Sequence, residues 1–385
     1  MAARQDADDV AHLCLRVLEL DPASTYAYGL LLNVVPWTKD SDSLHQYLAG
    51  ITSVDTLNPV VSGSMGAGRV FAASGAARDS VLRVLAGHAV PVVTRVVRDL
   101  RMRDPVVAEQ YLAELMVDTM PVYHQSIGQG AQIQLWFGEG RIAMTDSLVR
   151  GGLMQNIRQT LNRYFVAASM AGVGDAAATT RAVAELAAHA PMNSLDDYID
   201  SKNMVWATGW AVAAYHAVFG DTLVARQWKN VIAQLPQNDR TWDWPAALAA
   251  DIEARIAVNR GDIETAEREA RIAYEAWGVH SSNELESHPE PAMRFHLAEI
   301  LRSRGLLEES KRLYKSFVPP SNWSAFYTAR SSWQLGVLAE HRGDLREAAL
   351  HYSTALGLWS RGDASVAEWR RMADTALQRV LAQIG

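Results

Sequence analysis

The sequence predicts an all-α fold of stacked antiparallel helix pairs, and three regularities in its second half support this prediction. A glycine recurs at intervals of about 38 to 46 residues, a period typical of stacked repeat proteins. A small residue lies seven positions before each glycine, and another small residue lies five positions after it. The glycines are Gly174, Gly220, Gly261, Gly305 and Gly343.

Each of these glycines is expected to mark the turn between two helices. Glycine adopts the left-handed conformation that ends a helix at little steric cost. An aspartate follows four of the five glycines, and only Gly305 is followed by Leu306 instead. An aspartate at the start of a helix accepts hydrogen bonds from the first exposed backbone N–H groups. The pattern therefore predicts that one helix ends at the glycine and that the next helix begins at the aspartate. The aspartates are Asp175, Asp221, Asp262 and Asp344.

The small residues indicate where the two helices of a pair approach each other. Two antiparallel helices come close only where the facing side chains are small. In the last pair, Gly336 of the first helix is expected to face Ala348 and Ala355 of the second helix. The same role is predicted for Ala298 with Ser310 and for Ala254 with Ala266 and Ala273.

The last unit carries the most complete pattern: Leu335-Gly336, Gly343-Asp344, Ala348, Tyr352 and Ala355. It resembles the tetratricopeptide repeat (TPR) family, in which a Leu-Gly pair opens the helix contact and small–aromatic–small positions mark the second helix. The resemblance covers roughly residues 155–385 and, more loosely, 1–45. It implies a right-handed α-solenoid, a TPR-like superhelix, most similar to arrays in bacterial signalling proteins. The spacing exceeds the family's typical length of about 34 residues, so longer helices or links are expected.

Two regions are predicted on this basis. Residues 153–385 form the repeat array, closed by a charged capping helix from Ser365 to Ile384. Residues 1–152 form an irregular helical region with Gly-rich loops, a degenerate TPR-like segment. Helices are expected there over Asp79–Leu85, Val90–Arg101 and Val106–Met116.

One segment of the first region is ambiguous. Residues 132–137 alternate in polarity with period two, which is typical of a β-strand and allows a short hairpin. A loop between helix pairs is the alternative, and we favour it.

Composition excludes several classes of protein. The net charge of −7 argues against a nucleic-acid binder, and the run Arg95, Arg98, Arg101 and Arg103 reads as a solvated helix face. No apolar run is long enough to span a membrane, and the charged Met1–Val10 is unlike a signal peptide. A single cysteine, Cys14, excludes an intrachain disulfide, and we expect it to be a buried small hydrophobe. A cytoplasmic location is expected.

Motifs that carry chemistry are not found. The Gly-rich segment Ser62–Gly68 is followed by Arg69 and lacks the Gly-Lys-Ser/Thr of a phosphate-binding loop. The 11 histidines do not cluster at metal-ligand spacing. We therefore expect no cofactor, no metal and no enzymatic activity. An enzyme with a site in residues 60–150 is a further hypothesis, beside the two given at the end of this section.

A series of aromatic residues stands three positions before the small residue of each first helix, with Asp251 as its exception. The TPR resemblance implies that this position faces the concave groove, where aromatic residues dominate binding. Charged residues further along the helices would fix the register of a ligand. The alternative is that these rings fill gaps between adjacent pairs. The candidate groove consists of Tyr164, Trp210, Arg255, Phe295, Arg302, Trp333 and Glu340.

These features predict a non-catalytic scaffold that binds a protein or peptide partner in the concave groove of the superhelix, without nucleic acid or membrane. The alternative is a regulatory or sensor segment of a larger bacterial signalling protein, such as a kinase or a transcriptional regulator.

Overall fold

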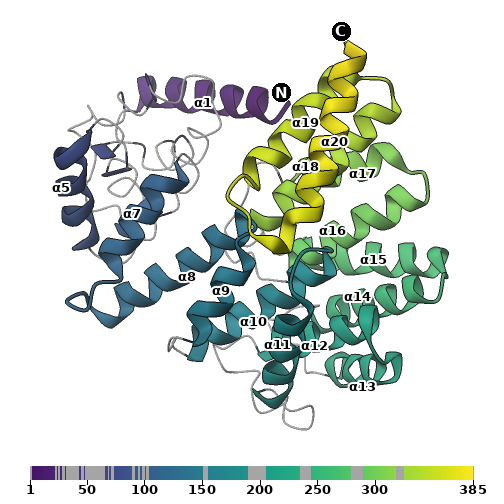
Figure 1. Ribbon diagram of the computed structural model, residues 1–385. Helices are drawn as coiled ribbons and strands as arrows, with labels where there is room; N and C mark the ends of the chain where they lie inside the picture. The colour runs from purple at the N-terminus through teal and green to yellow at the C-terminus, as the bar shows by residue number, and fades with distance from the viewer. Residues whose placement is uncertain are drawn as a thin grey trace. The chain divides into compact units, whose positions relative to one another are not determined.

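Every regular element that the computed structural model describes is a helix (Figure 1). The chain divides into two compact units, Met1–Leu135 and Trp136–Gly385, and the division falls within one helix. The structure describes residues 2–21, 73–88, 104–150, 155–189, 205–234, 244–278, 289–317 and 325–384, with isolated positions between 24 and 100.

The first unit contains α1 (Ala2–Leu20), α5 (Gly75–Ala86), α7 (Pro105–Leu115) and most of α8 (Val122–Gly138). Helix α7 begins after Asp104, whose carboxylate accepts hydrogen bonds from the backbone N–H groups of Val106 (3.0 Å) and Val107 (3.2 Å). The helices expected over Asp79–Leu85 and Val106–Met116 are confirmed. Cys14 on α1 is buried, as expected.

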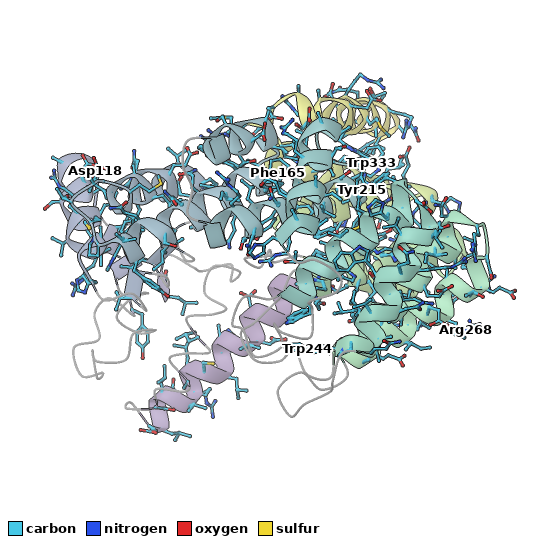
Figure 2. All side chains as sticks on the ribbon, turned by 90° about the horizontal axis from the view of Figure 1, so that it is seen from below. Asp118, Phe165, Tyr215, Trp244, Arg268 and Trp333 are labelled. Atoms are coloured by element: carbon cyan, nitrogen blue, oxygen red, sulfur yellow. The ribbon has the colours of Figure 1, made fainter. Side chains whose placement is uncertain are left out.

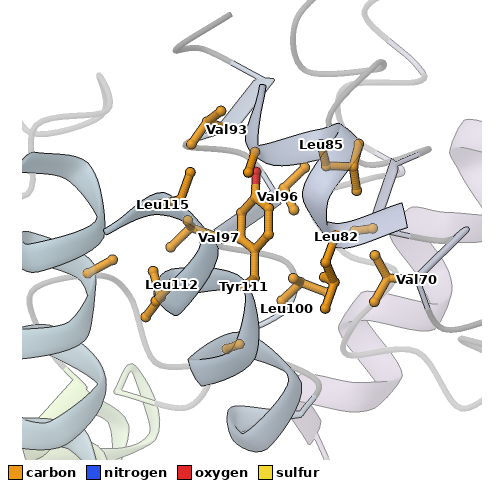
Figure 3. Close-up of a cluster of buried hydrophobic side chains, with 14 of the residues drawn as sticks. Val70, Leu82, Leu85, Val93, Val96, Val97, Leu100, Tyr111, Leu112 and Leu115 are labelled. Carbon is orange, nitrogen blue, oxygen red and sulfur yellow. The ribbon is translucent and has the colours of Figure 1, made fainter. Parts of the chain in front are cut away.

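The core of this unit surrounds Tyr111 on α7 (Figure 3). Leu82 and Leu85 of α5 pack there with Leu112 and Leu115 of α7. The described residues of the helix expected over Val90–Arg101 are helical and belong to the same core, namely Val92, Val93, Val96, Val97 and Leu100. The four arginines of the basic run and most of the Gly-rich segment lie outside the described residues.

Residues 132–137 are part of α8, so neither the hairpin nor the loop is correct. Gln132, Ile133, Leu135 and Phe137 are all buried, on more than one side of the helix. A helix satisfies its backbone hydrogen bonds internally, and it can therefore be buried on several sides without showing a clear period of 3.6 in its sequence.

The second unit is a series of helix pairs in which neighbours pack consecutively (Figure 1). It starts with the end of α8 and with α9 (Ile142–Arg150). The first helices are α10 (Gln155–Met170), α12 (Val205–Phe219), α14 (Trp244–Asn259), α16 (Pro289–Ser303) and α18 (Ala325–His341). The second helices are α11 (Ala176–His189), α13 (Thr222–Ala233), α15 (Ile263–Gly278), α17 (Leu307–Lys315) and α19 (Leu345–Leu358).

The turns between paired helices follow the predicted chemistry. Gly261, Gly305 and Gly343 have φ angles of 76°, 78° and 76°, in the left-handed region. Gly220 departs from the pattern, because it is not among the glycines with positive φ. All four predicted aspartate caps are confirmed, since each carboxylate accepts from a backbone N–H at 2.7–3.1 Å, at Asp175, Asp221, Asp262 and Asp344.

The small residues lie where paired helices meet. A Cβ atom added to Gly336 would lie 2.5 Å from the ring of Tyr352 in the second helix, so the ring occupies the space that glycine leaves. The Ser310 hydroxyl donates to the Ala298 carbonyl at 2.8 Å. Paired helices thus approach closely in the last two units: Ser310 meets Ala298 as predicted, whereas the side chain nearest to Gly336 is Tyr352 and not one of the predicted alanines.

The last helices of this unit contact its first ones. The Arg330 guanidinium on α18 donates from Nε to the Ala171 carbonyl at 2.8 Å, just beyond α10. Trp369 on α20 (Ala367–Ile384) donates from Nε1 to the Gly172 carbonyl at 2.7 Å. A short 3-10 helix, η3 (Ala364–Val366), precedes α20. The last helices of this unit therefore touch the turn after α10, a contact that the concave groove expected along the first helices did not include.

Helix α20 covers the last pair. It buries Ala373, Ala376 and Val380 against α19, and its charged residues Glu368, Arg371 and Asp374 are exposed. None of the described helices is both long enough and apolar enough to cross a membrane.

Candidate functional site: a pocket among the first helices

The first helices of the second unit enclose a pocket of about 370 Å³. Every residue that lines it comes from a first helix or from the turn that follows one. The polar groups are on α14 and α16, and the apolar wall comes from all five first helices. The lining consists of Met170, Ala171, Val218, Arg255, Val258, Asn259, Ala292, Phe295, His296, Glu299 and Tyr327.

Of the seven predicted groove residues, the structure brings two to this pocket, Arg255 and Phe295. Tyr164 and Trp210 are each 1% exposed and lie in the interior. The Tyr164 ring packs against Phe137 at 5.3 Å between ring centroids. These two rings fill space between helices, as the alternative interpretation has it, and they present no surface to a partner. The physical reason is that the first helices are close enough to bury one another's large side chains.

The other three predicted residues lie elsewhere. Trp333 is half-buried and packs on Tyr352 at 5.1 Å and on Trp369 at 6.2 Å (labelled in Figure 2). Glu340 accepts two hydrogen bonds from Arg379 of α20, both at 2.8 Å. Arg302 reaches Glu299 at 3.1 Å, immediately behind the pocket wall. The seven residues therefore do not form one continuous groove.

A buried carboxylate organises the polar side of the pocket. Asp251, 1% exposed, accepts from Arg255 Nε at 2.8 Å and from Trp210 Nε1 at 2.8 Å. His296 Nδ1 lies 3.4 Å from the second carboxylate oxygen. Arg255 and His296 both line the pocket, whereas Asp251 does not. Asp251 therefore orients two polar side chains of the pocket from behind its surface.

The electrostatics follow from this burial. Burial by itself would raise the pKa of Asp251. The Arg255 charge and the His296 contact lower this pKa by more, so the carboxyl is held well below its usual range. Burial lowers the pKa of His296, and the Arg255 charge lowers it too, against the opposing pull of Asp251 and Glu299. The site at neutral pH thus holds an ionised Asp251 and a neutral His296.

Glu299, one turn along α16 from His296, forms a second network. Its carboxylate accepts from the Tyr314 hydroxyl at 2.5 Å, from Gln334 Nε2 at 2.6 Å and from Arg302 at 3.1 Å. Burial and the Glu299 charge raise the pKa of Tyr314 well above its ordinary value. The Glu299 carboxylate is therefore largely satisfied by protein donors.

Sequence reasoning missed His296, Tyr327 and the central role of Asp251. The only available signal was Asp251 itself, the one acidic residue in a series of aromatic positions. His296 follows Phe295 directly, and nothing in its spacing distinguishes it from the other histidines.

No group of three or more His, Cys, Asp or Glu side chains suited to a metal ion occurs among the residues that the structure describes. A comparison of the chain with models of known families, with curated proteins and with solved structures finds no match.

Proposed function

We propose that the second unit is a non-catalytic binding module that takes a partner protein or peptide through the pocket among its first helices. The observation that carries this proposal is the pocket itself, in which a buried carboxylate orients two of the polar lining residues, Arg255 and His296. Concave sites of this size with apolar walls and a few placed polar groups are typical of binding sites. The partner would insert one anchoring side chain into the pocket. It would not lie along a series of exposed aromatic residues.

We further propose that the helix pairs are wound as a tight, right-handed, TPR-like superhelix. The regular left-handed glycines and the close contact at Gly336 support this arrangement. Tight winding would explain why the array's ends touch, and why the groove is reduced to a pocket.

The experiment is affinity capture from the cells that make this protein, with the intact chain as bait. Val258 lines the pocket and is 39% exposed, so Val258→Trp would obstruct the opening without filling a core position. Ile272→Trp is the matched control, because Ile272 is a 45% exposed branched residue on the second helix α15. We expect a protein retained by the wild type and by Ile272→Trp, and lost with Val258→Trp.

A partner retained equally by all three baits would contradict the proposed site. Trp333→Ala is a separate arm that tests the half-buried ring of the predicted groove. Loss of the partner in that arm alone would move the binding surface toward α18 and α20.

A further inference from the structure

The charged groups at the pocket are not balanced. Two carboxylates, Asp251 and Glu299, face three guanidiniums, Arg255, Arg302 and Arg330. Asp251 pairs with Arg255 at 2.8 Å, and Glu299 pairs with Arg302 at 3.1 Å. The Glu299 charge also acts on the third guanidinium, Arg330, but Glu299 already pairs with Arg302, so these five groups carry one more positive than negative charge.

Arg330 lies directly behind the pocket wall. It is 6% exposed, and its Nε donates to the carbonyl of Ala171, a lining residue. Its guanidinium lies 5.9 Å from the Phe295 ring, another lining residue, and 3.4 Å from the Trp369 ring. Its buried Nη1 has no hydrogen-bond partner among the described residues. Burial lowers the pKa of Arg330 to about 10, which leaves it charged at neutral pH. A buried cation without a directly paired carboxylate favours an anion nearby.

Two nitrogen atoms of the lining residues are available to such an anion. Arg255 uses Nε and Nη2 on Asp251 and on the Ala292 carbonyl, and no described group accepts from its Nη1. His296 directs Nδ1 at the ionised Asp251, which only accepts, so Nδ1 carries the hydrogen. Its Nε2, which has no partner among the described residues, then becomes a donor only when the ring is protonated.

The charged groups around His296 decide how readily its ring is protonated. These groups are Asp251 and Arg255 on α14 and Glu299 on α16. The pocket residues on α10, α12 and α18 are apolar side chains and the neutral Tyr327. An anion placed between Arg255 and His296 would screen the Arg255 charge that opposes protonation of the ring.

We propose that the pocket takes a carboxylate carried on an apolar body, and that its binding draws a proton onto His296. The carboxylate accepts from Arg255 Nη1 and from the new Nε2–H of His296, while Phe295, Tyr327 and Val218 contact the apolar body. The carboxylate is either that of a free organic acid or that of an acidic residue in a partner. This inference rests on the proposed function in one respect, namely that the pocket is the binding site.

The test is calorimetric titration of the full chain with 3-phenylpropionate and with 3-phenylpropanamide, its neutral isostere. We expect the acid to bind at least about tenfold more tightly than the amide at about pH 6, because a charge-assisted pair is lost in the amide. The affinity of the acid should fall by up to about tenfold per pH unit above the pKa of free His296. Repeating the titration in buffers of different ionisation enthalpy measures the proton taken up.

His296→Gln should abolish both the proton uptake and the pH dependence. His351→Gln is the control, because His351 also lies near a carboxylate, Glu347, but on α19 and away from the pocket. The peptide N-acetyl-Phe-Asp-amide separates the sources: it binds if an acidic residue is the natural group, and fails if only a free acid fits.

Equal binding of acid and amide to the wild-type chain would overturn the inference without any variant. Unchanged proton uptake in His296→Gln would also overturn it. If neither the acid nor the peptide binds, yet Val258→Trp still abolishes partner capture, the carboxylate is wrong and the proposed function stands. If the acid binds and Val258→Trp leaves partner capture intact, the pocket takes a carboxylate but is not the site that binds the partner protein.

Discussion

The indole nitrogen of Trp210 donates a 2.8 Å hydrogen bond to the buried carboxylate of Asp251. Each residue stands three positions before the small residue of its first helix, so this bond joins the successive first helices α12 and α14 in the interior. It also explains the one acidic residue in a series of aromatic positions. The same carboxylate also accepts from Arg255, which lines the pocket, so Asp251 connects the buried indole to the pocket.

Trp210→Phe should lower the free energy of unfolding by about 2 kcal/mol, because a hydrogen bond to a charged acceptor is worth roughly 1.5–3 kcal/mol. Chemical denaturation measures this difference. Trp228→Phe is the control: Trp228 is buried on α13, and no hydrogen bond from its indole is found among the described residues. Equal losses in the two variants would mean that the Asp251 contact contributes nothing.

Gly336→Ala should destabilise the protein by about 1–3 kcal/mol, the usual cost of overpacking a core. Its new Cβ would meet the Tyr352 ring at 2.5 Å. Gly357→Ala is the matched control, since Gly357 is also helical and has no atom within 4 Å of an added Cβ. That change should stabilise the helix by about 0.5–1 kcal/mol. Thermal unfolding of both variants tests the prediction, which fails if the two shifts have the same sign.

In the first unit, Tyr111→Phe should leave stability unchanged or raise it by about 1 kcal/mol, because it removes a buried hydroxyl that lacks a partner. The Tyr111 hydroxyl has no hydrogen bond among the described residues, and its side chain is fully buried in the core of Figure 3. Denaturation with urea measures the change. A loss of more than about 1 kcal/mol would indicate that the hydroxyl has a partner after all.

Stability should depend on pH through His296. Its pKa is lowered in the folded state by burial and by Arg255, whereas an unfolded histidine titrates near about 6.5. The unfolded state therefore binds more protons, and the free energy of unfolding should fall as pH drops below about 6.5. One such histidine contributes a slope of at most about 1.4 kcal/mol per pH unit. His296→Gln should reduce the slope between about pH 6.5 and pH 5, and an unaltered slope would show that this ring does not contribute.

Local features of this protein could be predicted from sequence because they depend on residues close together in the chain. A glycine's φ at a turn, an aspartate cap and the small residue beneath Tyr352 each follow from one residue's shape or hydrogen-bonding capacity. That is why the helix pairs around Gly261, Gly305 and Gly343 were expected where they occur. The helix over residues 132–137 was not expected, because burial on several sides removes the periodicity on which such a prediction depends.

The sequence by itself determined that helices pair and where each pair turns, since those choices are made within about 40 residues of chain. Only the tertiary structure decided which distant helices meet, and thus that Arg330 contacts Ala171 from 159 positions away. Such a contact depends on how every intervening helix packs on its neighbours, which no single residue encodes. Packing between helices buried Tyr164 and Trp210, and it gathered Arg255, His296 and Glu299 around one pocket.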